Sequence, residues 1–326
     1  MSQDILKQIG NTPLVRLNFL SKASVFAKLE YLNPGGSVKD RSALYMIEEA
    51  ERLGKLKPGG TIVDASSGNQ GIAMAMIGAA KGYKVIISVS EKISLEKLDT
   101  IKAYGAETVM SPATKTLDDA NSYHKKALDI AASTPGAFMP NQYYNLDNSK
   151  AHELSLGTEI WRQTAGKITH FIAAAGTGGT VSGAGKFLKS QNPNIKVIAI
   201  DSINSFRSTN GFPKPYKIDG MGVDFNSPVL DNTIVDQFIT VEDQPALSML
   251  KTMAQNHGLL IGPSSGAVAH CAFEYCQNLK ETDYVVIIFG DSGRAYLTKG
   301  YYLESQSDVK APIYDSKYNI NSQQLI

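Results

Sequence analysis

The sequence lacks the features that would assign it at once to a specialised class of protein. Only two of its 326 residues are cysteines. Cys271 and Cys276 lie in one expected helix, and their spacing fits neither a metal-binding knuckle nor a local disulfide bond. We therefore expect two buried thiols in a reducing cytoplasm, and we expect no metal site.

An excess of one charge is also missing, since 32 basic and 31 acidic side chains leave a net charge of +1. This balance provides no basic surface for nucleic acid or for an anionic membrane. No uninterrupted apolar stretch approaches the length of a membrane span, and the first residues, "MSQDILKQIGNTPLVRL", lack the apolar core of a signal peptide. These absences predict a cytoplasmic protein that acts on small molecules.

Short apolar, β-branched segments alternate with helical patterns along most of the chain, which predicts an α/β fold with parallel sheets. At this length we expect two domains. The expected strands are 25–32, 61–66, 84–90, 107–112, 170–176, 196–202 and 283–291. The expected helices span 69–82, 94–105 and 148–166, begin at Ser37, Leu117 and Thr180, and include two more before the last strand.

Two segments do not fit this alternation. Residues 203–243 are irregular and rich in Asn, Pro and Asp, which predicts a mobile loop over a cleft. After Tyr302 the hydrophobic pattern fades, which predicts a loosely held tail.

Lys39 follows a Pro-Gly-Gly turn at the start of an expected helix, within "LNPGGSVKDRSALYMIEEA". A cation is mildly unfavourable there, because the helix dipole leaves partial positive charge at the N-terminus. The same dipole favours the uncharged amine, which is a nucleophile and a base. Lys39 is therefore either a candidate catalytic residue or a tolerated surface lysine.

Three glycine-rich segments lie at strand-to-helix junctions: "SSGNQG" (66–71), "AGTGGTVSG" (175–183) and "GPSSGA" (262–267). Ligands of open α/β sheets bind beyond the carboxyl ends of the strands, so we expect all three segments to line one cleft. "GTGGT" can present backbone N–H groups to a phosphate at a helix N-terminus. "SSGNQG" can receive a carboxylate in the same way.

The phosphate is expected to be a single small group. A nicotinamide dinucleotide would require G-x-G-x-x-G, whereas Val181 stands at the third glycine. Asp201, at the end of the following strand, imitates the acid that binds ribose in such folds. An NAD-dependent dehydrogenase therefore remains an alternative.

A neutral lysine, a monophosphate cradle and a carboxylate cradle together suit pyridoxal phosphate acting on an amino acid. The motifs "IGNTPLVRL", "KLEYLNPGGSVKDR", "SSGNQG", "NQYYN", "GTGGT" and "IGPSSGA" resemble the cysteine synthase and cystathionine β-synthase family. The resemblance implies the tryptophan synthase β-like fold (fold type II), with the cofactor between two mostly parallel, helix-flanked sheets. We expect a smaller mobile domain of residues 1–12 and 35–145, a larger domain of 13–34 and 146–304, and a C-terminal tail of 305–326.

The resemblance also implies roles for individual residues. Lys39 would form the Schiff base with pyridoxal phosphate and move the α-proton, Asn69 would contact the ring 3′ oxygen, and Ser264 would face the pyridine nitrogen. The implied phosphate cradle consists of Gly176, Thr177, Gly178, Gly179 and Thr180. The implied substrate site consists of Ser66, Ser67, Gly68, Asn69, Gln70, Gln142 and Gly220.

The implied reaction is a β-replacement on serine or an O-activated serine through aminoacrylate, with a thiol nucleophile, in cysteine or cystathionine biosynthesis. Gln70 stands where the family usually has a short hydroxyl, which leaves serine, O-acetylserine and O-phosphoserine open as donors. "EKISLEK", "YKIDGMGVDF" and Tyr143 resemble the cystathionine enzymes, whereas Val223 differs from the animal ones. The nucleophile, whether sulfide, homocysteine or an amine, stays open.

A catalytically impaired regulatory protein that keeps the same fold is a further alternative, with Gln70 as the lesion. The resemblance implies a homodimer, and serine acetyltransferase as a partner. Because the chain ends "NSQQLI", the carboxylate of Ile326 could instead occupy the substrate-carboxylate loop of its own chain.

Overall fold

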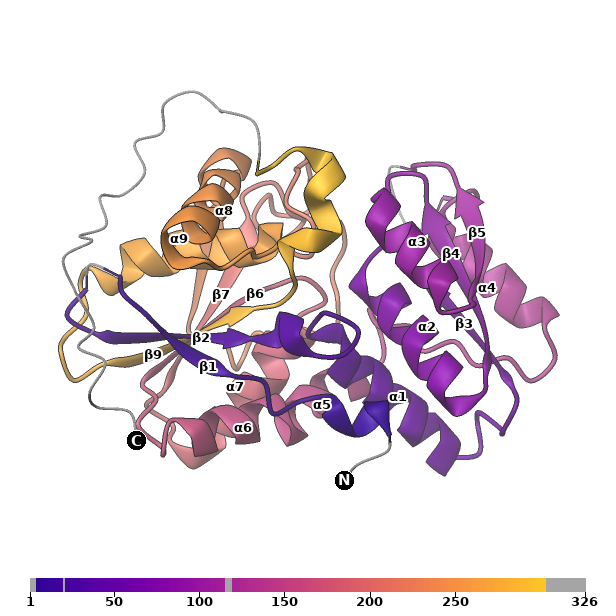
Figure 1. The fold of residues 1–326 in the computed structure, drawn as a ribbon, viewed down its shortest axis with the longest axis horizontal. Helices are drawn as coiled ribbons and strands as arrows, with labels where there is room; N and C mark the ends of the chain where they lie inside the picture. The colour runs from indigo at the N-terminus through magenta and orange to yellow at the C-terminus, as the bar shows by residue number, and fades with distance from the viewer. Residues whose placement is uncertain (1–3, 20, 115–118, 303–326) are drawn as a thin grey trace.

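Two β-sheets organise the chain in the computed structural model, which describes residues 4–19, 21–114 and 119–302 (Figure 1). The larger sheet has the strand order β1-β2-β9-β6-β7-β8, and the smaller one has the order β3-β4-β5. β1 runs antiparallel to β2, and the other neighbouring strands are parallel. The expected α/β class is confirmed.

The strands and helices largely follow the predicted pattern. The larger sheet consists of β1 (Leu14–Leu17), β2 (Ser24–Leu29), β6 (His170–Ala174), β7 (Lys196–Ser202), β8 (Gln237–Val241) and β9 (Tyr284–Phe289). The smaller sheet consists of β3 (Thr61–Ala65), β4 (Lys84–Ser90) and β5 (Glu107–Ser111). The α-helices are α1 (Lys39–Arg52), α2 (Asn69–Lys81), α3 (Leu95–Ala103), α4 (Tyr123–Ser133), α5 (Asp147–Leu154), α6 (Leu156–Gln163), α7 (Gly179–Gln191), α8 (Asp243–His257) and α9 (Pro263–Cys276). The short 3-10 helices are η1 (Ile5–Gln8), η2 (Glu30–Leu32) and η3 (Gly293–Lys299).

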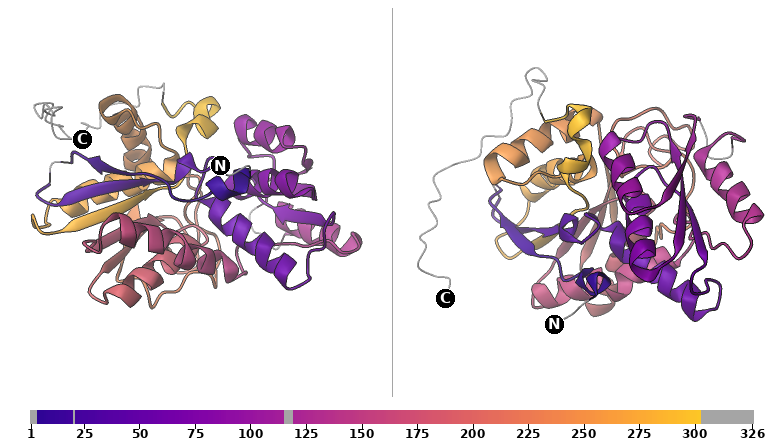
Figure 2. Two further views of the ribbon diagram at one scale, coloured as in Figure 1. Left: turned by 60° about the horizontal axis from the view of Figure 1, so that its bottom comes forward. Right: turned by 45° about the vertical axis from the view of Figure 1, so that its right-hand side comes forward.

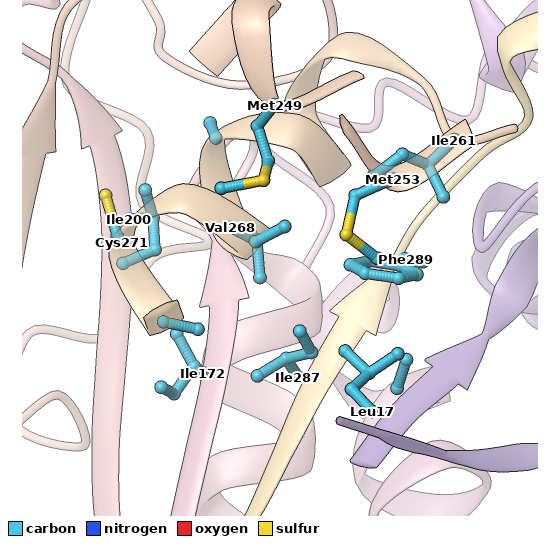
Figure 3. Packing of buried hydrophobic residues seen from close by; sticks show 14 of the residues in the cluster. Leu17, Ile172, Ile200, Met249, Met253, Ile261, Val268, Cys271, Ile287 and Phe289 are labelled. Atoms are coloured by element: carbon cyan, nitrogen blue, oxygen red, sulfur yellow. The ribbon is translucent and has the colours of Figure 1, made fainter. Parts of the chain in front are cut away.

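Helices cover both faces of the larger sheet, with α8 and α9 on one face and α5, α6 and α7 on the other (Figure 1). Figure 3 shows Met249 and Met253 of α8 and Val268 of α9 packed over Ile172 and Ile287 of the sheet. Burial of these apolar side chains stabilises the fold by about 25 cal/mol for each Å² removed from water. The strands that are covered on both faces read as continuous apolar runs for this reason.

Both cysteines lie in α9 and are buried, as the sequence predicts. Burial raises the pKa of the Cys271 thiol, and that of the Cys276 thiol, to about 12. Neither sulfur is therefore a thiolate at neutral pH, and both belong to the apolar core.

The smaller sheet stands beside the larger one, with its own helices α2, α3 and α4 (Figure 2). Its strands occupy residues 61–111, within the range expected for the smaller domain. The exact domain boundaries stay a prediction, and so does the mobility of this unit. The expected tail of 305–326 lies outside the described residues. The expectation that the carboxylate of Ile326 occupies the substrate-carboxylate loop falls on the same residues. No described helix has the length and apolar character needed to cross a bilayer.

Three sequence-based boundaries are wrong. The expected single helix over 148–166 is divided at Ser155, whose ψ is −72° and whose hydroxyl donates to the carbonyl of Ala151 at 2.7 Å. The close approach of Gly157 to α7 follows at once, since a Cβ there would lie 2.8 Å from that of Phe187. The expected helix start at Leu117 lies outside the described residues, but residues 119–122 are not helical, and α4 begins at Tyr123 after the N-cap Ser122.

The third error concerns residues 203–243, which are not wholly irregular, because they contain β8. This strand pairs with β7 at the edge of the sheet and is half-exposed, so its apolar signal is weak. The preceding loop is held by the hydrogen bond from the N–H of Phe206 to the carbonyl of Val223 at 2.8 Å. Its mobility stays a prediction.

Candidate active site

The start of α1 is fixed against the end of β9, and this contact positions Lys39. Ser37 forms a β-bridge with Asp291, and the N–H of Val38 donates to the carbonyl of Gly290 at 2.8 Å. Lys39 is the first residue of the helix, and its N–H donates to the Ser37 hydroxyl at 3.2 Å. A lysine far from β9 in sequence is thereby brought to the carboxyl edge of the larger sheet.

One small cavity lies at this edge. The sequence-predicted site residues that line it are Lys39, Gly176, Thr177, Gly178, Thr180, Gly220 and Ser264. Among the described residues that line it, none is acidic and Lys39 is basic. The structure therefore brings the candidate lysine, the glycine-rich loop and the start of α9 together around one space.

The amine of Lys39 is easier to deprotonate than an ordinary lysine. Burial lowers its pKa from 10.5 to about 8, and the carboxylate of Asp291 opposes this shift. The sequence argument attributed a neutral amine to the helix dipole, whereas the structure supplies desolvation as the larger cause. A substantial fraction of Lys39 is neutral at mildly alkaline pH, as a base or nucleophile requires.

The glycine-rich loop forms a close-fitting cradle at the start of α7. Gly178 is the N-cap and has φ of +93°, a conformation that favours glycine. A Cβ on Gly179 would lie 2.1 Å from Oδ1 of Asn148, so the backbone leaves no room for a side chain there. The first N–H groups of a helix have no intrahelical partner, and a phosphate at this end would satisfy them.

Asn148 supports the cradle from α5. Its Nδ2 donates to the carbonyl of Gln142 at 2.8 Å and to the Thr177 hydroxyl at 3.1 Å. His152, on the same helix, lies 3.4 Å from the hydroxyl of Thr180 through its Nε2. Burial, followed by the charges of Lys39 and Arg41, lowers the pKa of His152 well below its usual range. A neutral imidazole therefore lies behind the loop, and sequence reasoning did not single it out.

The "SSGNQG" segment uses its hydroxyls to hold its own backbone. Ser66 Oγ accepts from the N–H groups of Gly68 at 3.2 Å and Gly71 at 3.1 Å, and Ser67 Oγ accepts from the N–H of Ser90. The N-cap of α2 is Gly68, and the Ser66 hydroxyl satisfies the Gly71 N–H in the first turn of that helix, so it is less available to a substrate. Asn69 donates from Nδ2 to Oδ2 of Asp291 at 2.7 Å.

Gln70 is the unusual member of this segment. Its side chain is 1% exposed, and neither Oε1 nor Nε2 has a hydrogen-bond partner among the described residues. A buried amide without partners costs about 1–3 kcal/mol. Gln70 therefore lacks the hydrogen bonds expected of a buried structural residue. Gln142 is also buried, and it lines neither the small cavity nor the wider cleft described next.

A wider cleft, with a volume of about 630 Å³, opens beside the small cavity. Ser67, Ser90 and Lys92 line it from the unit of the smaller sheet, and residues 216–225 line it from the opposite side. Gly220 lines both spaces. The loop predicted to lie over a cleft does border one, and the two spaces together form the candidate active site.

Asp201, which the sequence offered as a ribose-binding acid, is engaged elsewhere. Its Oδ2 accepts from the Ser205 hydroxyl at 2.6 Å, and its Oδ1 accepts from the N–H of Ser202 at 2.8 Å. The side chain is 2% exposed. A ribose would have to displace these bonds, so the geometry disfavours the dehydrogenase alternative.

Sequence reasoning missed Asp291 as a site residue, although one signal was present. It follows β9 directly, at the carboxyl edge where ligands of such sheets bind. Its partner Tyr296 is five residues further along the chain, whereas Asn69 is 222 residues away and is brought to Asp291 only by the tertiary structure.

Comparison with known proteins gives consistent results. A family model described as "Pyridoxal-phosphate dependent enzyme" matches residues 5–291. The chain is 43% identical over 303 residues to a cysteine synthase of Staphylococcus aureus, covering 92% of this chain and 96% of that one. It is 40% identical to a cystathionine beta-synthase of Apis mellifera, covering 97% of this chain but spanning only 65% of that longer enzyme. A solved O-acetylserine dependent cystathionine beta-synthase from Helicobacter pylori superimposes with a TM-score of 0.87 at 36% identity, covering 93% of this chain and 99% of that one.

Proposed function

We propose, on the premise that the chain belongs to the family of pyridoxal-phosphate dependent enzymes, that it replaces the β-substituent of an O-activated serine with a thiol. The observation that carries the proposal is the single cavity that joins Lys39, the α7 cradle and Ser264. Each of the three suits a different part of the cofactor. The relatives named cysteine synthase and cystathionine beta-synthase support this reaction class.

The cavity fits pyridoxal phosphate in its chemistry. The N-terminus of α7 offers N–H donors and no acidic side chain, as a phosphate requires. Ser264, 8% exposed at the start of α9, offers a hydroxyl to the pyridine nitrogen. When bound, the cofactor supplies an electron sink for the α-carbon of an amino acid.

The residues of the chain would divide the remaining work. Lys39, with its lowered pKa, would attach the cofactor and take the proton from the substrate α-carbon. A serine at the pyridine nitrogen, in place of an acid, makes the electron sink less complete and thereby favours loss of the β-substituent. The backbone of "SSGNQG" would hold the substrate carboxylate at the start of α2.

The wider cleft supports an amino-acid thiol such as homocysteine over sulfide. Its volume far exceeds what a diatomic nucleophile needs, and Lys92 and Lys217 line it from opposite sides. Neither lysine forms an ion pair with another described residue. Asp224 lines the same cleft and interacts electrostatically with Lys92, so Lys217 is the better candidate to bind the carboxylate of the thiol. O-acetylserine is the first donor to test, since the Helicobacter pylori neighbour is described as dependent on it.

A screen of donors and nucleophiles tests this function. Protein supplied with pyridoxal phosphate is mixed with serine, O-acetylserine or O-phosphoserine, each with sulfide or homocysteine, and products are identified by mass spectrometry. We expect cystathionine from O-acetylserine and homocysteine at the highest kcat/KM. If no donor is consumed while the cofactor is bound, the regulatory alternative replaces the enzyme.

Gln70→Thr tests whether residue 70 reads the donor. We expect the variant to gain activity with O-acetylserine relative to serine and O-phosphoserine, because it restores a short hydroxyl beside the carboxylate. The expected change in the ratio of kcat/KM values is about tenfold or more. Gln70→Asn, which keeps an amide, serves as the matched control, and an unchanged donor ratio in Gln70→Thr would show that residue 70 does not select the donor.

We also propose that the protein forms a homodimer in the cytoplasm, and that serine acetyltransferase is a candidate partner. Both proposals rest on the resemblance to the cysteine synthases. Light scattering of the purified protein, alone and mixed with serine acetyltransferase, measures both. A monomeric mass that is unchanged by the second protein would reject them.

A further inference from the structure

A buried chain of hydrogen bonds lies behind the cavity, and we call its four members, Asn69, Lys97, Asp291 and Tyr296, the Asp291 network. Lys97 Nζ donates to Tyr296 Oη at 2.8 Å, Tyr296 Oη donates to Asp291 Oδ2, and Asn69 Nδ2 donates to the same oxygen at 2.7 Å. Lys97, Asp291 and Tyr296 are at most 4% exposed. So many polar groups are rarely buried together without a function or a structural need.

The direction of the hydrogen bonds follows from the donors available. A lysine ammonium only donates, and a phenol has one hydrogen. Tyr296 must therefore accept from Lys97 and give its own hydrogen to Asp291. Burial, together with the charge of Asp291, raises the pKa of Tyr296 well above its usual range, so the phenol keeps that hydrogen. Both donors converge on one oxygen of a carboxylate.

The carboxylate of Asp291 is confined as well as bonded. A Cβ on Gly262 would lie 2.0 Å from Asp291 Oδ1, so the backbone of that glycine closes one side. Oδ1 itself has no hydrogen-bond partner among the described residues. The side chain thus holds a fixed position, and Oδ1 can still accept a hydrogen bond. The backbone of Asp291 pairs with Ser37, whose hydroxyl accepts from the N–H of Lys39.

The network joins the two sheet units. Asn69 begins α2 and Lys97 lies in α3, whereas Asp291 and Tyr296 follow β9. Other charged or titratable groups around it are Glu96, Asp219, Lys299 and Tyr302. Asp219 and Lys299 pair with each other at 2.9 Å, and Glu96 accepts from the N–H of Thr298 at 2.7 Å. These outer groups are already satisfied, which leaves Asp291 as the negative charge that acts on Lys39.

We propose that Asp291 is a positioning residue of the active site, which fixes the Asn69 amide and compensates the positive charge of Lys39, while Tyr296 and Lys97 hold it in place. The proposal rests on the proposed function for the role of Lys39. With one N–H bonded to Asp291, the Asn69 amide keeps a defined orientation, and its second N–H remains for a ligand.

Opposite changes of charge should move the proton affinity of Lys39 in opposite directions. Asp291→Asn keeps the shape and removes the negative charge, so Lys39 should lose its proton at lower pH. Lys97→Met removes a positive charge from the same network, so the field of Asp291 is less compensated and Lys39 should lose its proton at higher pH. We expect a change in proton affinity of about tenfold for Asp291→Asn and a smaller one for Lys97→Met.

Two measurements determine the pH at which Lys39 loses its proton. In protein freed of cofactor, the rate at which an amine reagent labels Lys39, located by peptide mass spectrometry, gives the pH midpoint. In protein with pyridoxal phosphate, the visible absorbance is followed against pH. Neither measurement needs turnover. The positioning role of Asp291 can therefore be rejected while the proposed function stands, and the proposed function can be rejected while the positioning role stands.

Thr298→Val is the matched control, because it removes another hydrogen bond across the same junction, from Thr298 Oγ1 to Glu96 Oε2 at 2.7 Å, without involving any of the four members of the network. We expect the control to keep the wild-type midpoint. Folded Asp291→Asn protein with the wild-type midpoint would overturn the proposal. If Asp291→Asn does not fold, Lys97→Met decides alone, and an unchanged midpoint there overturns it equally.

Discussion

Lys39→Ala is expected to remove covalent attachment of pyridoxal phosphate and to lower kcat by about 10²- to 10⁴-fold, the usual contribution of a positioned acid–base group. The amine lines the cavity beside the α7 cradle and has a pKa of about 8. No other lysine among the described residues lines this cavity, so none can replace it without a movement of the chain. The measurements are visible absorbance after dialysis and turnover with O-acetylserine.

Lys39→Arg sharpens this test, because a guanidinium keeps the charge but is never neutral in a protein. We expect it to be as inactive as Lys39→Ala. Lys102→Ala, at an exposed position on α3, is the control and should behave as wild type. Retention of yellow colour and turnover by Lys39→Ala would remove Lys39 from the mechanism.

Arg41→Met is expected to destabilise the protein by about 3–5 kcal/mol, the typical result of leaving a buried charge without its partner. The guanidinium bonds Glu30 through Nε at 2.6 Å and Glu159 through Nη1 at 2.7 Å. Lys28, fully buried, donates to Glu159 at 2.8 Å. Without Arg41, two buried carboxylates would share one ammonium group.

The destabilisation caused by Arg41→Met should decrease as the pH is lowered. Burial alone would raise the pKa of Glu159, but hydrogen bonds from Arg41 hold it at about 2, below the ordinary 4.5. A depressed pKa contributes stability that is complete above 4.5 and is lost as the pH falls toward 2. The difference in unfolding free energy between wild type and Arg41→Met should therefore narrow in acid.

Urea unfolding at neutral pH and in acid measures both effects. Arg52→Met is the control on the same helix, since the Arg52 side chain is 67% exposed in its pair with Glu49, and exposed pairs contribute little. We expect no measurable change for it. If Arg41→Met unfolds at the wild-type urea concentration, the buried ion pairs of Arg41 do not contribute to the stability of the fold.

The sequence predicted the assembly of the cavity for a general physical reason. Parallel strands deliver their carboxyl ends to one edge, so the junction between β6 and α7 at Gly176 had to lie there. The expected strand-to-helix junction at 262–267 is wrong, because α9 follows the helix α8, and Ser264 reaches the cavity through tertiary packing. The lowered pKa of Lys39 also followed, although the sequence suggested a dipole where burial is the larger cause. Local chemistry and topology were sufficient for this part of the site.

The remaining part could not be predicted because it depends on contacts between distant residues. Asn69 and Asp291 are 222 residues apart in sequence, and nothing local to either indicates the other. From the sequence, the Ser66 hydroxyl could bind a substrate or stabilise the start of a helix. Only the hydrogen bonds that it accepts from Gly68 and Gly71 identify the second role. The break at Ser155 is likewise set by the packing of Gly157 against α7.

The pairing of β2 with β9 has a consequence for the nascent chain. Ser24 pairs with Tyr284 and Leu29 with Phe289, so β2 can pair with β9 only after the ribosome has synthesised residues 284–289. The unit of β3, β4 and β5 needs only residues 61–111 and can form early. Because the start of α1 is bonded to Gly290 and Asp291, Lys39 reaches its place only after these two residues have been synthesised, when the strands and helices around the cavity already exist.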